Sequence, residues 1–168
     1  MKADLALGEF TCPITFEPVR PPRPVVKEEE GVTYVVQGDY EIAFHTVLRF
    51  ADATALPVQA RLFGEDSRKV VVRDADGRPA ALSGYTQGRS EILDREGNII
   101  FQGRYYDTRT YQTLTGDDAL TPIGTRICDH WINGFGRGRY AGHAFSLCVH
   151  LTREHEPAFA GEARGRID

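Results

Sequence analysis

The sequence has no long apolar run. None of its hydrophobic segments approaches the ~20 consecutive apolar residues that a membrane-spanning helix requires. Residues 1–10 lack the basic end and the apolar stretch of a signal peptide. We therefore expect a cytoplasmic protein with no membrane partner.

An excess of charge of one sign is also missing. The formal net charge is −4, and the 24 acidic and 20 basic residues are interspersed rather than gathered into blocks. Binding of DNA or RNA requires a concentrated basic face, so no nucleic-acid partner is predicted. Arginine greatly outnumbers lysine, which is typical of a bacterial protein from a GC-rich genome.

Patterns for metal or nucleophilic chemistry are absent. The three cysteines, Cys12, Cys128 and Cys148, form no CxxC pair, which argues against a disulfide framework or a zinc cage and favours buried thiols. The five histidines contain no HxH or HxxxH pair, and there is no GxSxG motif. The sequence therefore predicts a function that uses neither a metal nor another cofactor.

What is present is a single domain of ordinary globular composition, with 168 residues of which 41% are hydrophobic and 26% charged. The prolines in residues 1–31 disfavour helices and central strands. We therefore expect this segment to form an extended arm, which crosses the mouth of the β-barrel predicted below or reaches a neighbouring subunit. The barrel is expected over 32–155, and a tail over 156–168.

From residue 32 onward the pattern is that of β-strands. In Glu41–Phe50 apolar and polar residues alternate, as the opposite faces of a half-buried strand require. Turn sequences such as Asp76-Gly77 and Glu96-Gly97-Asn98 recur between such segments, and no window shows helical periodicity. We therefore predict an all-β, antiparallel domain that closes into a small barrel with an apolar interior.

Two glycine-containing segments carry a family resemblance. The spacing Gly136-x-Gly138-x-Tyr140-x-Gly142 predicts a β turn or bulge, because no helix follows it to make a phosphate-binding loop. It resembles the GxGxYxG turn of the allene oxide cyclase and dirigent barrels. The segment Asn98–Gly116 is similar to the cyclase strand pair that leads from VQGxY to a TGG turn. Residues 117–130 separate the two motifs here, whereas the cyclase joins them in one turn.

The resemblance spans Gln87–Leu151 and has implications for fold and function. It implies an antiparallel eight-stranded barrel, calycin-like in architecture, in a homo-oligomer such as a dimer or the trimer common in that superfamily. It also implies a lumen that binds a small apolar molecule and steers its cyclisation or coupling. The cyclase's catalytic residues lie in its N-terminal half, where no motif aligns, so none is transferred to this chain.

Candidate catalytic residues come instead from the faces of the predicted strands. Asp129 shares a face with Ile127 and Trp131, where its charged form would be disfavoured, as general acid or base catalysis requires. At a strand end Asp129 would instead be solvated or paired with an arginine. His130 points to the opposite face, and histidine exchanges protons near neutral pH. One of these two should face the lumen.

Tyr105 lies on the face of Ile99 and Phe101, where its hydroxyl could bind a carbonyl or enolate oxygen together with Arg126, or be a satisfied core hydroxyl. Aromatic residues predicted to shape the substrate pocket are Phe44, Tyr111, Trp131 and Phe145.

These residues favour a cofactor-independent isomerase or cyclase for a small apolar or polyketide-like substrate, which would act by confinement with acid and base assistance. Two alternatives stay open: a lipocalin-like carrier of a hydrophobic molecule, and an assembly subunit whose barrel is filled by side chains. An ionisable group deep in the lumen would favour the enzyme, and a uniformly apolar lumen the carrier.

Overall fold

A computed structural model describes residues 5–20, 23–107, 110–113, 126–153 and 159–168. In these ranges the chain is almost entirely β, and the helical content is a single 3-10 turn, η1, at Gly138–Tyr140. The strands are β1 Gly8–Arg20, β2 Arg23–Glu29, β3 Val32–Phe50, β4 Ala55–Arg73, β5 Pro79–Leu93, β6 Ile99–Asp107, β7 Thr110–Thr113, β8 Arg126–Gly136, β9 Ala144–Arg153 and β10 Phe159–Ile167.

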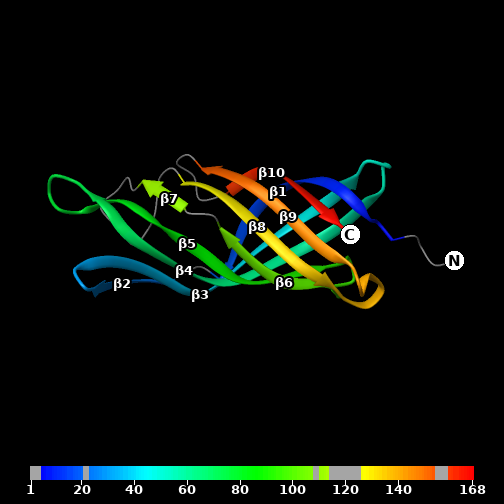
Figure 1. Ribbon diagram of the computed structural model, residues 1–168, viewed down its shortest axis with the longest axis horizontal. Helices are drawn as coiled ribbons and strands as arrows, with labels where there is room; N and C mark the ends of the chain where they lie inside the picture. Colours follow the sequence, from blue (N-terminus) through cyan, green and yellow to red (C-terminus); the bar gives the residue numbers. More distant parts are fainter. Residues whose placement is uncertain (1–4, 21–22, 108–109, 114–125, 154–158) are drawn as a thin grey trace.

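The sheet closes on itself. Its strands follow the order β1-β10-β9-β8-β6-β5-β4-β3, and β3 pairs with β1 to complete an antiparallel cycle of eight. The predicted eight-stranded antiparallel barrel is thus confirmed. β2 pairs outside this cycle with β3, and β7 bridges β5 and β8. In Figure 1, β2 and the neighbouring parts of β3, β4 and β5 extend away from the end at which β9 and β10 lie.

The N-terminal segment is not the predicted arm. Residues 8–20 form β1, which lies between β10 and β3 and closes the barrel, and Arg23–Glu29 is β2. The prolines suggested an arm, but a two-residue period was already present: the buried inward positions are Phe10, Cys12 and Ile14. Pro13 stands on the exposed face between them. In this strand, burial of alternate apolar side chains therefore outweighs the preference of proline for irregular structure.

The C-terminal segment is not the predicted tail either. Phe159–Ile167 forms β10, which pairs with both β1 and β9. Its inward positions include the small residues Ala163 and Gly165, which conceal the two-residue period. A Cβ on Gly165 would lie 2.3 Å from Cζ of the Phe10 ring, so this aromatic ring occupies the space that a side chain would need.

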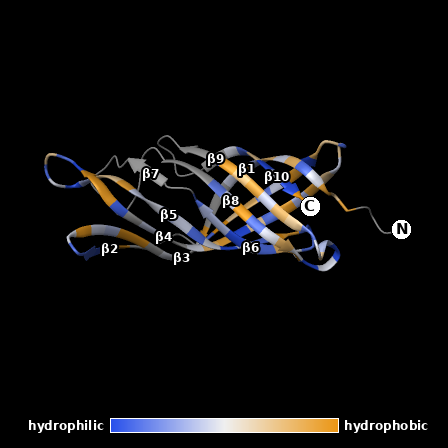
Figure 2. Cartoon of the chain, viewed as in Figure 1, coloured by the Kyte–Doolittle hydropathy of each residue, from blue (hydrophilic) through white to orange (hydrophobic). Residues whose placement is uncertain are grey.

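Aromatic rings fill one end of the barrel. Phe101 packs on Phe145 and Tyr140 with ring centroids 5.2 and 4.9 Å apart. Phe10 packs on Phe145 and Phe50 at 5.6 and 5.5 Å. Figure 2 shows hydrophobic and hydrophilic segments alternating along the strands that surround this core. The predicted inward face of Glu41–Phe50 carries Ile42, Phe44, Thr46, Leu48 and Phe50. It is confirmed, since the last four are buried and Ile42 is partly buried against the same core.

Several predicted turns are also confirmed. The Asp94–Asn98 turn joins β5 to β6, and Oδ1 of Asp94 accepts hydrogen bonds from the backbone amides of Glu96 and Asn98 at 3.0 and 2.8 Å. The glycine-rich turn between β8 and β9 places Gly138 and Gly142 at positive φ angles of 56° and 92°. These backbone conformations are easily reached only by glycine, which explains the sequence spacing.

The Cys12 thiol is expected to be chemically inert in the folded protein. Burial raises its pKa from 9.0 to about 11, although the nearby Thr46 hydroxyl opposes this change. At pH 7 to 8 the thiolate fraction should therefore be about a hundredfold lower than for an exposed cysteine. We expect iodoacetamide, followed by peptide mass mapping, to modify Cys12 only after unfolding by urea.

The same raised pKa predicts a dependence of stability on pH. Because the folded state disfavours the thiolate, the stabilisation is complete below about pH 9 and is lost as the pH rises towards 11. The difference amounts to at most about 2.7 kcal/mol. Urea unfolding between pH 8 and 11 should show a steeper loss for the wild type than for Cys12→Ala. Equal slopes, or rapid alkylation of native Cys12, would contradict this assignment.

Candidate functional site

The inner faces of β6 and β8 change from apolar to polar along the barrel. On β6 the buried inward residues are Phe101, Tyr105 and Asp107, and on β8 they include Ile132 and His130. The antiparallel register places Asp107 directly opposite His130, and Tyr105 opposite Ile132. An acid and a base therefore meet inside the barrel, where the apolar core ends.

Asp107 and His130 form a buried hydrogen-bonded pair. Nδ1 of His130 is bonded to Oδ1 of Asp107, and only 4% and 3% of these residues are exposed. The Tyr105 ring lies nearly parallel to the imidazole, with centroids 5.2 Å apart and planes inclined by 26°. With Nδ1 donating to the carboxylate, Nε2 is the imidazole nitrogen that can accept a proton. This arrangement fixes both the orientation and the tautomer of a potential general base.

The energetics of the pair point to function rather than to stability. Transfer of a carboxylate and an imidazole out of water carries a desolvation cost that their mutual attraction often does not repay. Two apolar residues would fill the same volume without this cost. Phe101 on β6 and Ile132 on β8 are examples of such buried apolar residues on these strands. The His130–Asp107 dyad is therefore the strongest candidate for a chemical site among the described residues.

Two of the predicted catalytic residues, His130 and Tyr105, come together in this site. The position of the Tyr105 hydroxyl differs from that expected for an oxygen-binding donor, because it lies against β4 and β5. A Cβ on Gly64 would lie 1.8 Å from Tyr105 Oη, and one on Gly88 would lie 2.7 Å from its ring. The two glycines thus leave space for the Tyr105 ring, and this ring packs against the imidazole of His130.

The predicted pocket residues are dispersed. Phe44 and Phe145 belong to the packed core. Phe145 pairs with Gly134, four residues along β8 from His130, a separation of about 13 Å at the usual rise per residue. Trp131 is half-buried, and strand alternation places it on the outer face, opposite to its buried neighbours His130 and Ile132. Tyr111, Arg126 and Asp129 lie in described strands, but their side chains are not among those that the structure describes.

Sequence reasoning missed Asp107. Its signal was the two-residue period of β6, in which residues 101, 103, 105 and 107 share the inward face. The face of Ile99, Phe101 and Tyr105 was followed only as far as the tyrosine, and so the carboxylate was not considered. Continuing the same period to position 107 would have placed an acid on the inward face beside the tyrosine already proposed.

In comparisons with protein-family models, curated proteins and solved structures, none matched this chain. The resemblance to allene oxide cyclases therefore stays a prediction from the two glycine motifs. Within the described ranges no group of three or more histidine, cysteine or acidic residues could hold a metal ion. In the same ranges no helix is long and apolar enough to cross a membrane.

Proposed function

We propose that this protein is a cofactor-independent isomerase or cyclase in which His130 moves a proton within a small apolar or polyketide-like substrate. The observation that carries the proposal is the buried hydrogen bond between His130 and Asp107 inside a mostly apolar barrel. A carrier of hydrophobic molecules needs only an apolar wall. An oriented and buried acid–base pair is what proton transfer needs.

The proposed step begins at a carbon next to a substrate carbonyl. Nε2 of His130 takes the proton, and the electron pair of the broken C–H bond moves into the carbonyl as an enolate. Asp107, bonded at Nδ1, stabilises the imidazolium that forms. Return of the proton to another carbon yields an isomer. Attack of the enolate carbon on a second carbonyl of the same chain closes a ring, and His130 then protonates the new alkoxide.

Confinement supplies the rest of the proposed catalysis. Tyr105 on one side of the imidazole restricts where a substrate can approach, and the surrounding apolar strands exclude water. A flexible chain held in a reactive conformation loses less entropy on reaching the transition state. Tyr105 is in this view a positioning residue for His130.

Solvent exchange at carbon tests the proposal. The protein is incubated in D₂O with a panel of β,γ-unsaturated ketones and 1,3-diketones, and loss of the α-proton signal is followed by NMR. Exchange above the buffer rate is expected for the wild type. His130→Gln should lower the rate by about a hundredfold or more. Asp107→Asn should lower it too, since an amide no longer stabilises the imidazolium.

His45→Gln is the matched control, because His45 is exposed on the outer face of β3 between the buried residues Phe44 and Thr46. It should exchange at the wild-type rate. Circular dichroism shows whether each variant is folded. If His130→Gln does not fold, the exchange rate of Asp107→Asn tests the proposal. Saturable binding of panel compounds without exchange would identify a carrier. Undiminished exchange in both dyad variants, or neither binding nor exchange by the wild type, would also overturn the proposal.

A further inference from the structure

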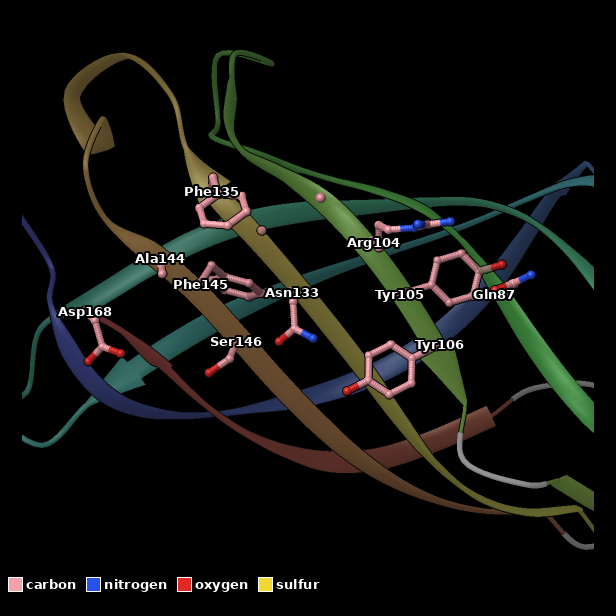
Figure 3. A pocket seen from close by; sticks show the side chains of 12 residues that line it. Gln87, Arg104, Tyr105, Tyr106, Asn133, Phe135, Ala144, Phe145, Ser146 and Asp168 are labelled. Atoms are coloured by element: carbon pink, nitrogen blue, oxygen red, sulfur yellow. The ribbon is translucent and has the colours of Figure 1, made fainter.

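A cavity lies on the outside of the barrel. It has a volume of about 610 Å³ and is formed mainly by the outer faces of β6, β8 and β9. This volume falls within the range of roughly 300 to 1,000 Å³ that small-molecule sites occupy. Figure 3 shows the groove, with Arg104, Asn133 and Ser146 on three successive strands. His130 and Asp107 face the interior and do not line this outer groove, although the Tyr105 ring that stacks on His130 is also part of its lining.

The centre of the groove is a row of polar side chains that crosses the sheet. The register pairs Arg104 with Asn133, and Asn133 with Ser146. Adjacent strands are about 4.8 Å apart, so a guanidinium, an amide and a hydroxyl stand in one line along the hydrogen-bonding direction. All three groups can donate hydrogen bonds, and such a line suits the oxygen atoms of an anion.

Two more arginines, Arg89 and Arg166, flank this row, and each makes an ion pair. On one side Arg104 neighbours Arg89, whose Nε lies 3.7 Å from Oε1 of Glu91 and whose guanidinium lies over the Phe63 ring. At the other end of the row, Arg166 is bonded to the Asp168 carboxylate. Among the described residues Arg104 makes no ion pair. The positive charge available to a ligand is therefore that of Arg104.

Aromatic groups flank the polar row on both sides. Phe135 is 77% exposed and Tyr106 44% exposed, and both line the groove. Each exposed ring offers an apolar surface that a ligand ring can cover. Rings beside a guanidinium and an amide provide an apolar surface for a flat ligand and donors for its charged end.

From this arrangement we propose that the outer groove binds a small aromatic carboxylate. The carboxylate oxygens accept hydrogen bonds from Arg104 and Asn133, and the ligand ring packs on Phe135, two residues along β8 from Asn133. Arg104 favours an anionic over a cationic ligand, since the Asp168 carboxylate that also lines the groove is paired with Arg166. The exposed rings favour an aromatic anion over a compact one such as acetate or phosphate.

Titration of the full chain with cinnamate tests the proposal. Binding is followed by amide chemical shifts and by the fluorescence of Trp131, the single tryptophan, which is half-buried on the outer face of β8. Saturable binding is expected. Acetate, inorganic phosphate and the uncharged cinnamamide should each bind more weakly than cinnamate by about tenfold or more, because each lacks either the ring or the charge.

Substitutions locate the site. Arg104→Gln should weaken cinnamate binding by about tenfold or more through loss of the charge-assisted hydrogen bonds. Arg49→Gln is the matched control, since Arg49 is exposed on β3, away from the groove, and it should bind as the wild type does. His130→Gln should also bind normally, which separates this site from the dyad. No saturable binding of cinnamate, equal binding of acetate, or unchanged binding by Arg104→Gln would overturn the proposal.

Discussion

Gly103→Ala is expected to destabilise the barrel by about 3 to 5 kcal/mol, an effect large enough to threaten folding. A Cβ at this position would lie 2.1 Å from the carbonyl oxygen of Asn133 and 2.6 Å from Cα of Gly134. Both are backbone atoms of the adjacent strand β8, and they cannot move without breaking the ladder between β6 and β8. In thermal unfolding the midpoint should fall by about 10 °C or more.

Gly134→Ala is the control for this prediction, because Gly134 is the cross-strand partner of Gly103. Its added Cβ would meet the backbone of Gln102 at 3.3 Å, a tight contact that small shifts can relieve. We expect a loss of about 1 kcal/mol or less. If the two variants were equally stable, close approach of the backbones would not be the reason for glycine at position 103.

Phe101→Ala is expected to cost about 3 to 5 kcal/mol of unfolding free energy. The ring is fully buried, with an exposed fraction of 0%, and it contacts both Tyr140 and Phe145. Its removal would leave a cavity that these rings can fill only in part, since each also packs against other groups. Urea denaturation followed by circular dichroism measures the loss.

Phe135→Ala makes the same chemical change on the neighbouring strand, at a residue that is 77% exposed. Its expected effect on stability is about 0.5 kcal/mol or less, in either direction. A large loss for Phe135→Ala, or a small one for Phe101→Ala, would show that the interior of the barrel is not packed around Phe101. Because Phe135 also lines the outer groove, this variant should keep its stability while losing affinity for cinnamate.

The candidate site could be predicted only in part. The alternation of residues around Trp131 indicated that either Asp129 or His130 faces inward, and the structure places His130 there. Tyr105 was assigned to the interior from its place in the period of β6, and it is buried. Its hydroxyl extends towards Gly64, on a strand far away in the sequence, which the period of β6 alone could not show.

The partner of His130 required knowledge of the register. Asp107 and His130 are 23 residues apart, and they meet because β6 pairs with β8 in one particular alignment. A shift of one residue would place Trp131 opposite Asp107 and turn the acid away from the base. The cross-strand row of Arg104, Asn133 and Ser146 depends on the same alignment.

The sequence by itself determined the β class, the antiparallel hairpins and the inward faces of several strands, because a strand's faces follow from a local period of two residues. It also determined the turns that glycine makes possible. Only the tertiary structure decided that residues 8–20 and 159–167 complete the barrel, and which polar side chains meet across it. These outcomes depend on the pairing of distant strands, whose energy is shared among many contacts and is not encoded in any short segment.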